Sequence, residues 1–106
     1  MLPGVSWFIE RRLKGIGQKL ARAREDLAIA DEQLVYLADD AADAQVRSVV
    51  SEGGSAGLDY NEAQRHSDAM ARHRSDLVDT IARLEATQDE LLDQLVLVGL
   101  AETTAT

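Results

Sequence analysis

Two histidines and a glutamate are spaced so that they could share one face of a helix. His66 and His73 are seven residues apart, and Glu62 precedes His66 by four. Such spacings bring side chains to one side of an α-helix, and imidazole and carboxylate groups bind zinc. The set could begin a metal site, or a pH-sensitive patch with Asp40. A metal site needs more converging ligands than one helix face supplies, so we predict no bound metal.

The glycine-rich stretch "SEGGSAGLDYNEA", residues 51–63, raises a second chemistry, that of a phosphate-binding loop. Such a loop has the pattern GxxxxGK[ST] between a strand and a helix. The stretch has no Lys-Ser or Lys-Thr pair. The chain also has no cysteine, which excludes disulfides, thiolate metal sites and cysteine nucleophiles. We therefore predict no catalytic residue, no cofactor site and no enzymatic activity.

Apolar residues recur in alternating steps of three and four on both sides of the glycine-rich stretch. From Ile9, all eleven positions before the glycines are apolar, and from Tyr60, nine of the twelve positions after them are apolar. This spacing is the a/d seam of a coiled coil. The polar exceptions are Ser67, Arg74 and Gln88. We interpret Arg74 and Gln88 as residues that specify the register of the helices rather than as ligand contacts.

The two seams predict an all-α fold, an antiparallel two-helix coiled-coil hairpin with the glycines at its turn. Folding the chain about residue 54 pairs Leu13 with Leu95 and brings Arg22 near Glu85. The basic N-terminal segment then faces the acidic C-terminal segment, so charge and apolar pattern select the same register. We expect one domain over residues 1–106, with helix 1 at about 6–51, a turn at 52–58, helix 2 at about 59–98 and a frayed tail at 99–106.

The predicted turn carries acidic residues. Gly53 or Gly54 would take the left-handed conformation that ends helix 1. Asp59 would cap helix 2, with Glu62 three residues later. We assign Glu52, Asp59 and Glu62 to the hairpin tip. "GLDYNEAQR" resembles the acidic tip of Gre-type transcript cleavage factors, although their adjacent acidic pair is absent. This resemblance implies, as an alternative function, a regulator that enters the RNA polymerase secondary channel.

The net charge of −8 is unevenly distributed along the chain. An acidic protein is repelled by phosphates, so direct nucleic-acid binding is not expected. No segment has the roughly 20 apolar residues that cross a bilayer, and the N-terminus lacks the basic region of a secretory signal. Together with the absence of cysteine, these features predict a cytoplasmic protein.

Many apolar residues lie outside the two seams, where the partner helix cannot bury them. Exposed apolar area of this extent usually marks an interface. We expect a second copy to cover it, giving an antiparallel dimer or a four-helix bundle, or else a larger protein assembly. The predicted interface residues are Val5, Trp7, Phe8, Ile29, Tyr36, Leu92, Val96, Leu97 and Leu100.

The segment "WFIERRLKGIGQKLARAR" supports a further alternative, a peripheral membrane protein. Its basic residues could bind anionic lipids while Trp7 and Phe8 enter the headgroup region. The basic residues spread around the helix, however, and helix 2 supplies an acidic partner within the chain. We therefore favour an interaction or scaffold module over membrane docking.

Two segments, "LADDAADAQVRSVVSE" and "EAQRHSDAMARHRSDLVDTIARLEATQDELLDQL", are similar to small uncharacterised helical-hairpin proteins of high-GC Gram-positive bacteria. The similarity spans roughly residues 13–95. It implies an intracellular α-helical hairpin, and it assigns no activity and no site residue.

Overall fold

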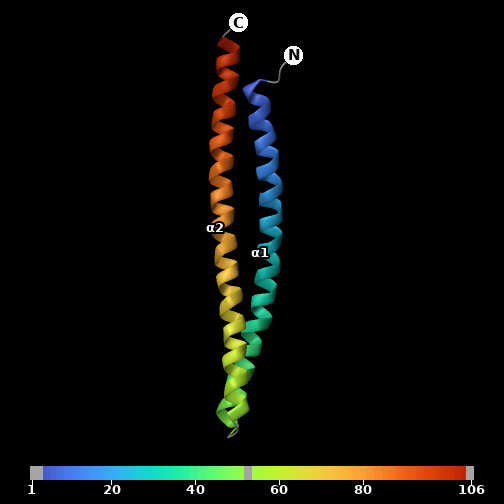
Figure 1. Cartoon of the computed structure of the whole chain (residues 1–106), viewed down its shortest axis with the longest axis vertical. Helices are drawn as coiled ribbons and strands as arrows, with labels where there is room; N and C mark the ends of the chain where they lie inside the picture. Colours follow the sequence, from blue (N-terminus) through green and yellow to red (C-terminus); the bar gives the residue numbers. More distant parts are fainter. Residues whose placement is uncertain (1–3, 52–53, 105–106) are drawn as a thin grey trace. The chain divides into compact units, whose positions relative to one another are not determined.

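The fold consists of two long α-helices. A computed structural model describes residues 4–51 and 54–104, and these ranges contain two helices and no strand. Helix α1 is Val5–Val50 and helix α2 is Gly54–Thr104, so the predicted all-α hairpin is confirmed (Figure 1). Each limit of α1 lies one residue before the predicted one. Glu52 and Gly53, both assigned to the turn, lie outside the described residues.

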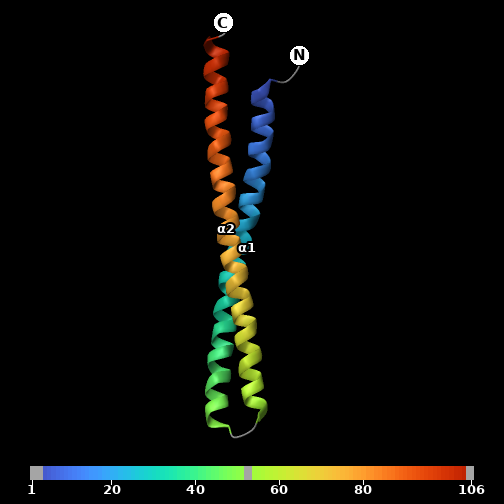
Figure 2. The same cartoon turned by 60° about the vertical axis from the view of Figure 1, so that its left-hand side comes forward.

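The chain divides into two compact units. Unit 1 joins Met1–Arg24 to Asp79–Thr106, and unit 2 is Glu25–Val78. In each unit a segment of α1 lies beside a segment of α2 and runs in the opposite direction, as Figures 1 and 2 both show. The start of α1 and the end of α2 therefore belong to unit 1.

The seam of α1 lies where the apolar pattern predicts it. All eleven predicted positions are buried or half-buried. Leu20 is the most enclosed, with 1% of its surface exposed. Every residue of α1 that is buried belongs to this seam, namely Ile9, Leu20, Ala23, Ala30, Ala41 and Ala44. Because four of the six are alanines, much of this seam is narrow, which suits close packing of two helices.

The seam of α2 follows the same rule. All twelve predicted positions are buried or half-buried, including the polar exceptions Arg74 and Gln88. The buried members are Ser67, Ile81 and Leu91, with exposed fractions of 9%, 9% and 2%. The apolar period therefore predicts which face of each helix is covered, even where a polar residue interrupts it.

Helix α2 begins earlier than the sequence predicts. It starts at Gly54, so the predicted turn is wrong for residues 54–58, and Asp59 lies inside the helix rather than at its N-cap. Of the two glycines predicted to take the left-handed conformation, Gly54 does not take it, because no described glycine has a positive φ, and Gly53 lies outside the described residues. The seam explains the early start, since Ala56, four residues before Tyr60, is half-buried. Each added residue gains a backbone hydrogen bond, which here outweighs the low helix propensity of glycine.

Helix α2 also ends later than predicted. It continues through Gly99 to Thr104, so the predicted frayed tail is wrong for residues 99–104. Gly99 costs about 1 kcal/mol relative to Ala there, but Thr103 Oγ1 donates a hydrogen bond to the Gly99 carbonyl at 2.9 Å. In unit 1 this last part of α2 lies beside the start of α1, because a Cβ built on Gly4 would be 3.6 Å from Glu102 Oε1. A carboxylate near the N-terminus of α1 is favoured by the helix dipole.

The burial of Leu20 gives a test of the seam. We expect Leu20→Ala to lower the free energy of unfolding by about 2–3 kcal/mol, the lower part of the usual range, because a cavity at a two-helix seam can partly relax. Leu58→Ala is the control. Leu58 is 69% exposed, so its loss should change stability by less than about 0.5 kcal/mol. Urea unfolding followed by far-ultraviolet circular dichroism measures both, and equal effects would contradict the seam.

Candidate interaction surface

Exposed apolar side chains lie on both helices of unit 1. Their exposed fractions range from 41% for Trp7 to 65% for Leu97. They remain exposed because they lie outside the a/d seam that joins the helices. The group contains seven of the nine predicted interface residues, and we call it the end cluster: Val5, Trp7 and Phe8 from α1, with Leu92, Val96, Leu97 and Leu100 from α2.

The aromatic part of the end cluster has a defined geometry. The rings of Trp7 and Phe8 meet edge to face, with centroids 4.9 Å apart and an interplanar angle of 83°. The guanidinium carbon of Arg11, one helical turn later, lies 5.4 Å from the centroid of the Trp7 ring. Such aromatic pairs contribute about 0.5–1.5 kcal/mol, and exposed cation–π contacts about 0.5–1 kcal/mol. These contacts hold both rings on the surface without burying them.

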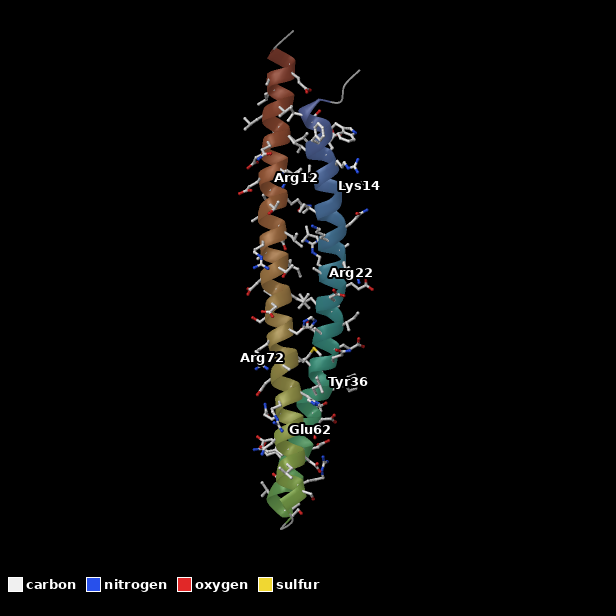
Figure 3. The ribbon with its side chains drawn as sticks, viewed as in Figure 1. Arg12, Lys14, Arg22, Tyr36, Glu62 and Arg72 are labelled. Carbon is white, nitrogen blue, oxygen red and sulfur yellow. The ribbon has the colours of Figure 1, made fainter. Side chains whose placement is uncertain are left out.

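A shallow hollow lies beside Trp7 on the surface of α1. It is lined by Trp7, Glu10, Arg11, Lys14, Gly15 and Gln18. Figure 3 shows Lys14 on the side of α1 that faces away from α2. Gly15 contributes no side chain to the hollow, and a Cβ built there would meet no atom within 4 Å other than those of its chain neighbours and its own helical backbone. Packing within the chain therefore does not require this glycine, and the hollow leaves room for the close approach of another molecule.

Unit 2 exposes its own apolar residues on α1. The other two predicted interface residues, Ile29 and Tyr36, are 45% and 70% exposed. Figure 3 shows the Tyr36 ring pointing away from α2. Near the end of α1, three valines extend this surface with exposed fractions between 63% and 79%: Val46, Val49 and Val50.

Unit 2 also exposes two apolar residues of α2 that are not among the predicted interface residues. Leu58 is 69% exposed and Val78 is 40% exposed. Leu58 was assigned to the turn, so its place on a helix surface went unrecognised. Extending the seam back to Ala56 would have placed Leu58 two residues beyond a seam position and therefore on the outside of the helix. Val78 immediately follows the seam residue Leu77, and its position in the repeat was the available signal.

Ion pairs join the two helices within each unit. In unit 2, Arg74 Nε donates a hydrogen bond to Asp31 Oδ1, so the arginine that interrupts the seam is paired across it. In unit 1, Arg24 Nη2 lies 3.7 Å from Glu85 Oε1. The sequence predicted that Arg22 lies near Glu85. The structure corrects this prediction, because the partner of Glu85 is Arg24. Two residues along a helix turn a side chain by about 200°, so Arg22 and Arg24 cannot face the same neighbour.

Asp59 and Glu62, two of the three carboxylates assigned to the tip, lie along the first turns of α2. Asp59 and Glu62 are exposed, and with Asp40 and His66 they line a shallow hollow of unit 2. His66 Nε2 lies 4.0 Å from Glu62 Oε1, and both side chains are largely exposed. His73 is also exposed. Within residues 4–51 and 54–104, no group of three or more His, Asp or Glu side chains could hold a metal ion.

No protein-family model, curated protein or solved structure matches the sequence. Within the described part of the chain, neither helix combines the length and the apolar character that crossing a membrane requires.

The hollow at Gly15 gives a test of the free space on α1. We expect Gly15→Ala to raise the free energy of unfolding by about 1 kcal/mol, because alanine favours the helix and its methyl group meets no neighbour. Gly17→Ala is the matched control, since the position of Gly17 is equally open. Both effects are measured by thermal unfolding at low protein concentration. A loss of stability at Gly15 would show that the chain itself occupies the hollow.

The Arg74–Asp31 pair gives a test of whether this ion pair specifies the register of the two helices. A double-mutant cycle with Arg74→Met and Asp31→Asn should yield a coupling energy of about 0.2–1 kcal/mol, since both side chains are substantially exposed. High salt should reduce the coupling, because exposed charges are screened. Urea unfolding at low and high salt measures it. A coupling of zero at low salt would mean that the pair does not specify the register.

Proposed function

We propose that the chain is a non-enzymatic interaction or scaffold module, which self-associates or docks on a larger assembly through apolar surface outside the hairpin seam. The observation that carries this proposal is the end cluster, in which Trp7 and Phe8 are 41% and 56% exposed. The described hollows are open surface features of a two-helix fold, and small-molecule sites are typically concave and enclosed. Recognition of another protein therefore suits this surface better than chemistry on a small substrate.

The end cluster is apolar surface that the chain alone leaves in water. Covering apolar area contributes about 25 cal/mol per Å², and large aromatic side chains supply most of the area at protein interfaces. Tryptophan and arginine are enriched among the residues that dominate binding energy. In the end cluster, Trp7 is held by contacts with Phe8 and Arg11. A ring that is already held in place loses less conformational entropy when a partner covers it.

Substitutions in the end cluster test the proposal. Sedimentation velocity over a range of concentrations should show species larger than the 11.5 kDa chain, if the partner is a second copy. Trp7→Ala with Leu97→Gln should weaken the association at least about tenfold, because an anchor and a large apolar contact are lost. Ala86→Gln, an exposed position on α2 of unit 1 outside the cluster, is the control and should leave association unchanged.

The same variants address docking on a larger assembly. Affinity capture from the native cell should recover a partner that the Trp7→Ala, Leu97→Gln variant loses and the Ala86→Gln variant retains. A monomeric wild-type chain, with no captured protein that depends on the end cluster, would contradict the proposed function.

A further inference from the structure

We propose that a second copy of this chain is the partner, and that α1 of one copy docks antiparallel on α1 of the other. This inference rests on the proposed function and names its partner. The docking surface in unit 1 is the basic strip, formed by Trp7, Phe8, Arg11, Lys14, Gly15 and Arg22. The docking surface in unit 2 is the acidic strip, formed by Glu32, Tyr36, Asp39, Asp43, Val49 and Val50. In the heptad repeat of the seam all these positions are b, c or f, on the side of α1 opposite the seam.

The two strips carry opposite charge on one helix. Residues 5–24 contain six Lys or Arg and one Glu, whereas residues 25–50 contain seven Asp or Glu and one Arg. Apart from Asp26, which is half-buried, all of these charged residues are exposed. Among the described residues, ion pairs within the chain engage only Arg24 of the first segment and Asp31 of the second. The charges of the two strips are therefore free to meet charges of another molecule.

The arrangement of charge selects the antiparallel direction. Two parallel copies of α1 in register would place basic on basic and acidic on acidic residues, whereas antiparallel copies place basic on acidic. An antiparallel pairing with Lys14 opposite Asp43 also aligns the apolar residues of the strips. Trp7, seven residues before Lys14, then meets Val50, seven residues after Asp43. Phe8 meets Val49 in the same register. These four side chains are between 41% and 79% exposed in the single chain.

The hollow at Gly15 fits this pairing. One residue beyond Lys14, Gly15 meets Ala42 of the other copy, so two small residues face each other and permit a close approach of the helices there. Ala42 is exposed, and the space above Gly15 is empty within the described chain. The pairing gives a physical reason for Gly15, which lowers the stability of the helix and is not required by packing within the single chain.

The charge balance of the units favours a second copy over an anionic membrane. Unit 1 contains seven Lys or Arg and seven Asp or Glu, and unit 2 contains four against twelve. The net charge of −8 therefore belongs to unit 2. An anionic bilayer repels a chain with this net charge, so on a membrane only the charges of the basic strip itself would favour binding. A second copy offers the same strip an acidic helix surface of matching length.

Charge reversal tests the pairing. Variant A carries Arg11→Glu and Lys14→Glu, and variant B carries Asp39→Lys and Asp43→Lys. Each variant alone should self-associate at least about tenfold more weakly than wild type at low salt, because like charges then face each other. An equimolar mixture of A and B should recover wild-type association, since both contacts between A and B are complementary again. Arg65→Glu with Arg83→Glu, on α2, is the control with the same charge change as A and should associate more strongly than A.

Engineered cysteines test the register. The chain has no cysteine, and a disulfide forms only between residues whose Cα atoms lie about 4.4–6.8 Å apart. A mixture of Lys14→Cys and Asp43→Cys chains should form covalent heterodimers under mild oxidation. Neither single variant should crosslink to itself with comparable yield. Crosslinking of Lys14→Cys chains to one another would indicate a parallel pairing and would overturn the inference.

The outcomes separate this inference from the proposed function. If wild type self-associates but A and B behave as wild type and no heterodimer crosslinks, the inference is wrong and an interaction module using another surface remains. If wild type is monomeric at all concentrations, the inference is wrong, and docking on a different protein is decided by the capture experiment. Vesicles of equal parts phosphatidylcholine and phosphatidylserine provide the third arm. Binding that variant A loses, by a chain that stays monomeric, would assign the basic strip to a membrane.

Discussion

A helix that packs against a single neighbour can bury only one face, and this limit governs both helices of the protein. The face is the a/d seam, which contains every buried residue of the described chain. Alanines make parts of the seam narrow, so the helices approach closely but shield little apolar surface outside the seam from water. In the described part of the chain, the same geometry leaves the large apolar residues outside the seam exposed to water. The exposed Trp7 and Phe8 are therefore a consequence of the two-helix architecture, and they make a partner energetically favourable.

Charge serves two purposes on this scaffold. Between the helices, the pairs Arg24–Glu85 and Arg74–Asp31 link specific positions of α1 and α2 and thereby oppose slippage of the seam. On the outer side of α1, charges that have no ion-pair partner in the described chain form one basic and one acidic segment. Exposed pairs contribute little to stability, but segregated charge strongly affects which surfaces meet and in which direction. The same kinds of residue thus link the helices within the chain and, in the proposed dimer, would set the direction of docking.

The glycines show how far local rules reach. Gly54 was expected, as one of two candidates, to end helix 1, and Gly99 to lie beyond the end of helix 2, yet Gly54 begins α2 and Gly99 lies inside it. Helix propensity is a weak preference of about 1 kcal/mol per glycine. Extension of the helix is opposed by that preference and favoured by further backbone hydrogen bonds, by the half-buried Ala56 and by the Thr103 hydroxyl. Terminal glycines in a long amphipathic helix are therefore poor evidence for its boundary.

The amino-acid sequence by itself determined the fold class, the antiparallel direction and the covered face of each helix. An apolar repeat of three and four residues is a local property of the chain, and a helix converts it directly into one buried stripe, from Ile9 through Ala44 and from Tyr60 through Val98. Only the tertiary structure decided the limits of α2, the choice of Arg24 over Arg22 as the partner of Glu85, and the open space above Gly15. Each of these depends on where a side chain points relative to a neighbour far away in sequence. Small energy differences of that kind are settled by packing, and the residue pattern of one helix does not contain them.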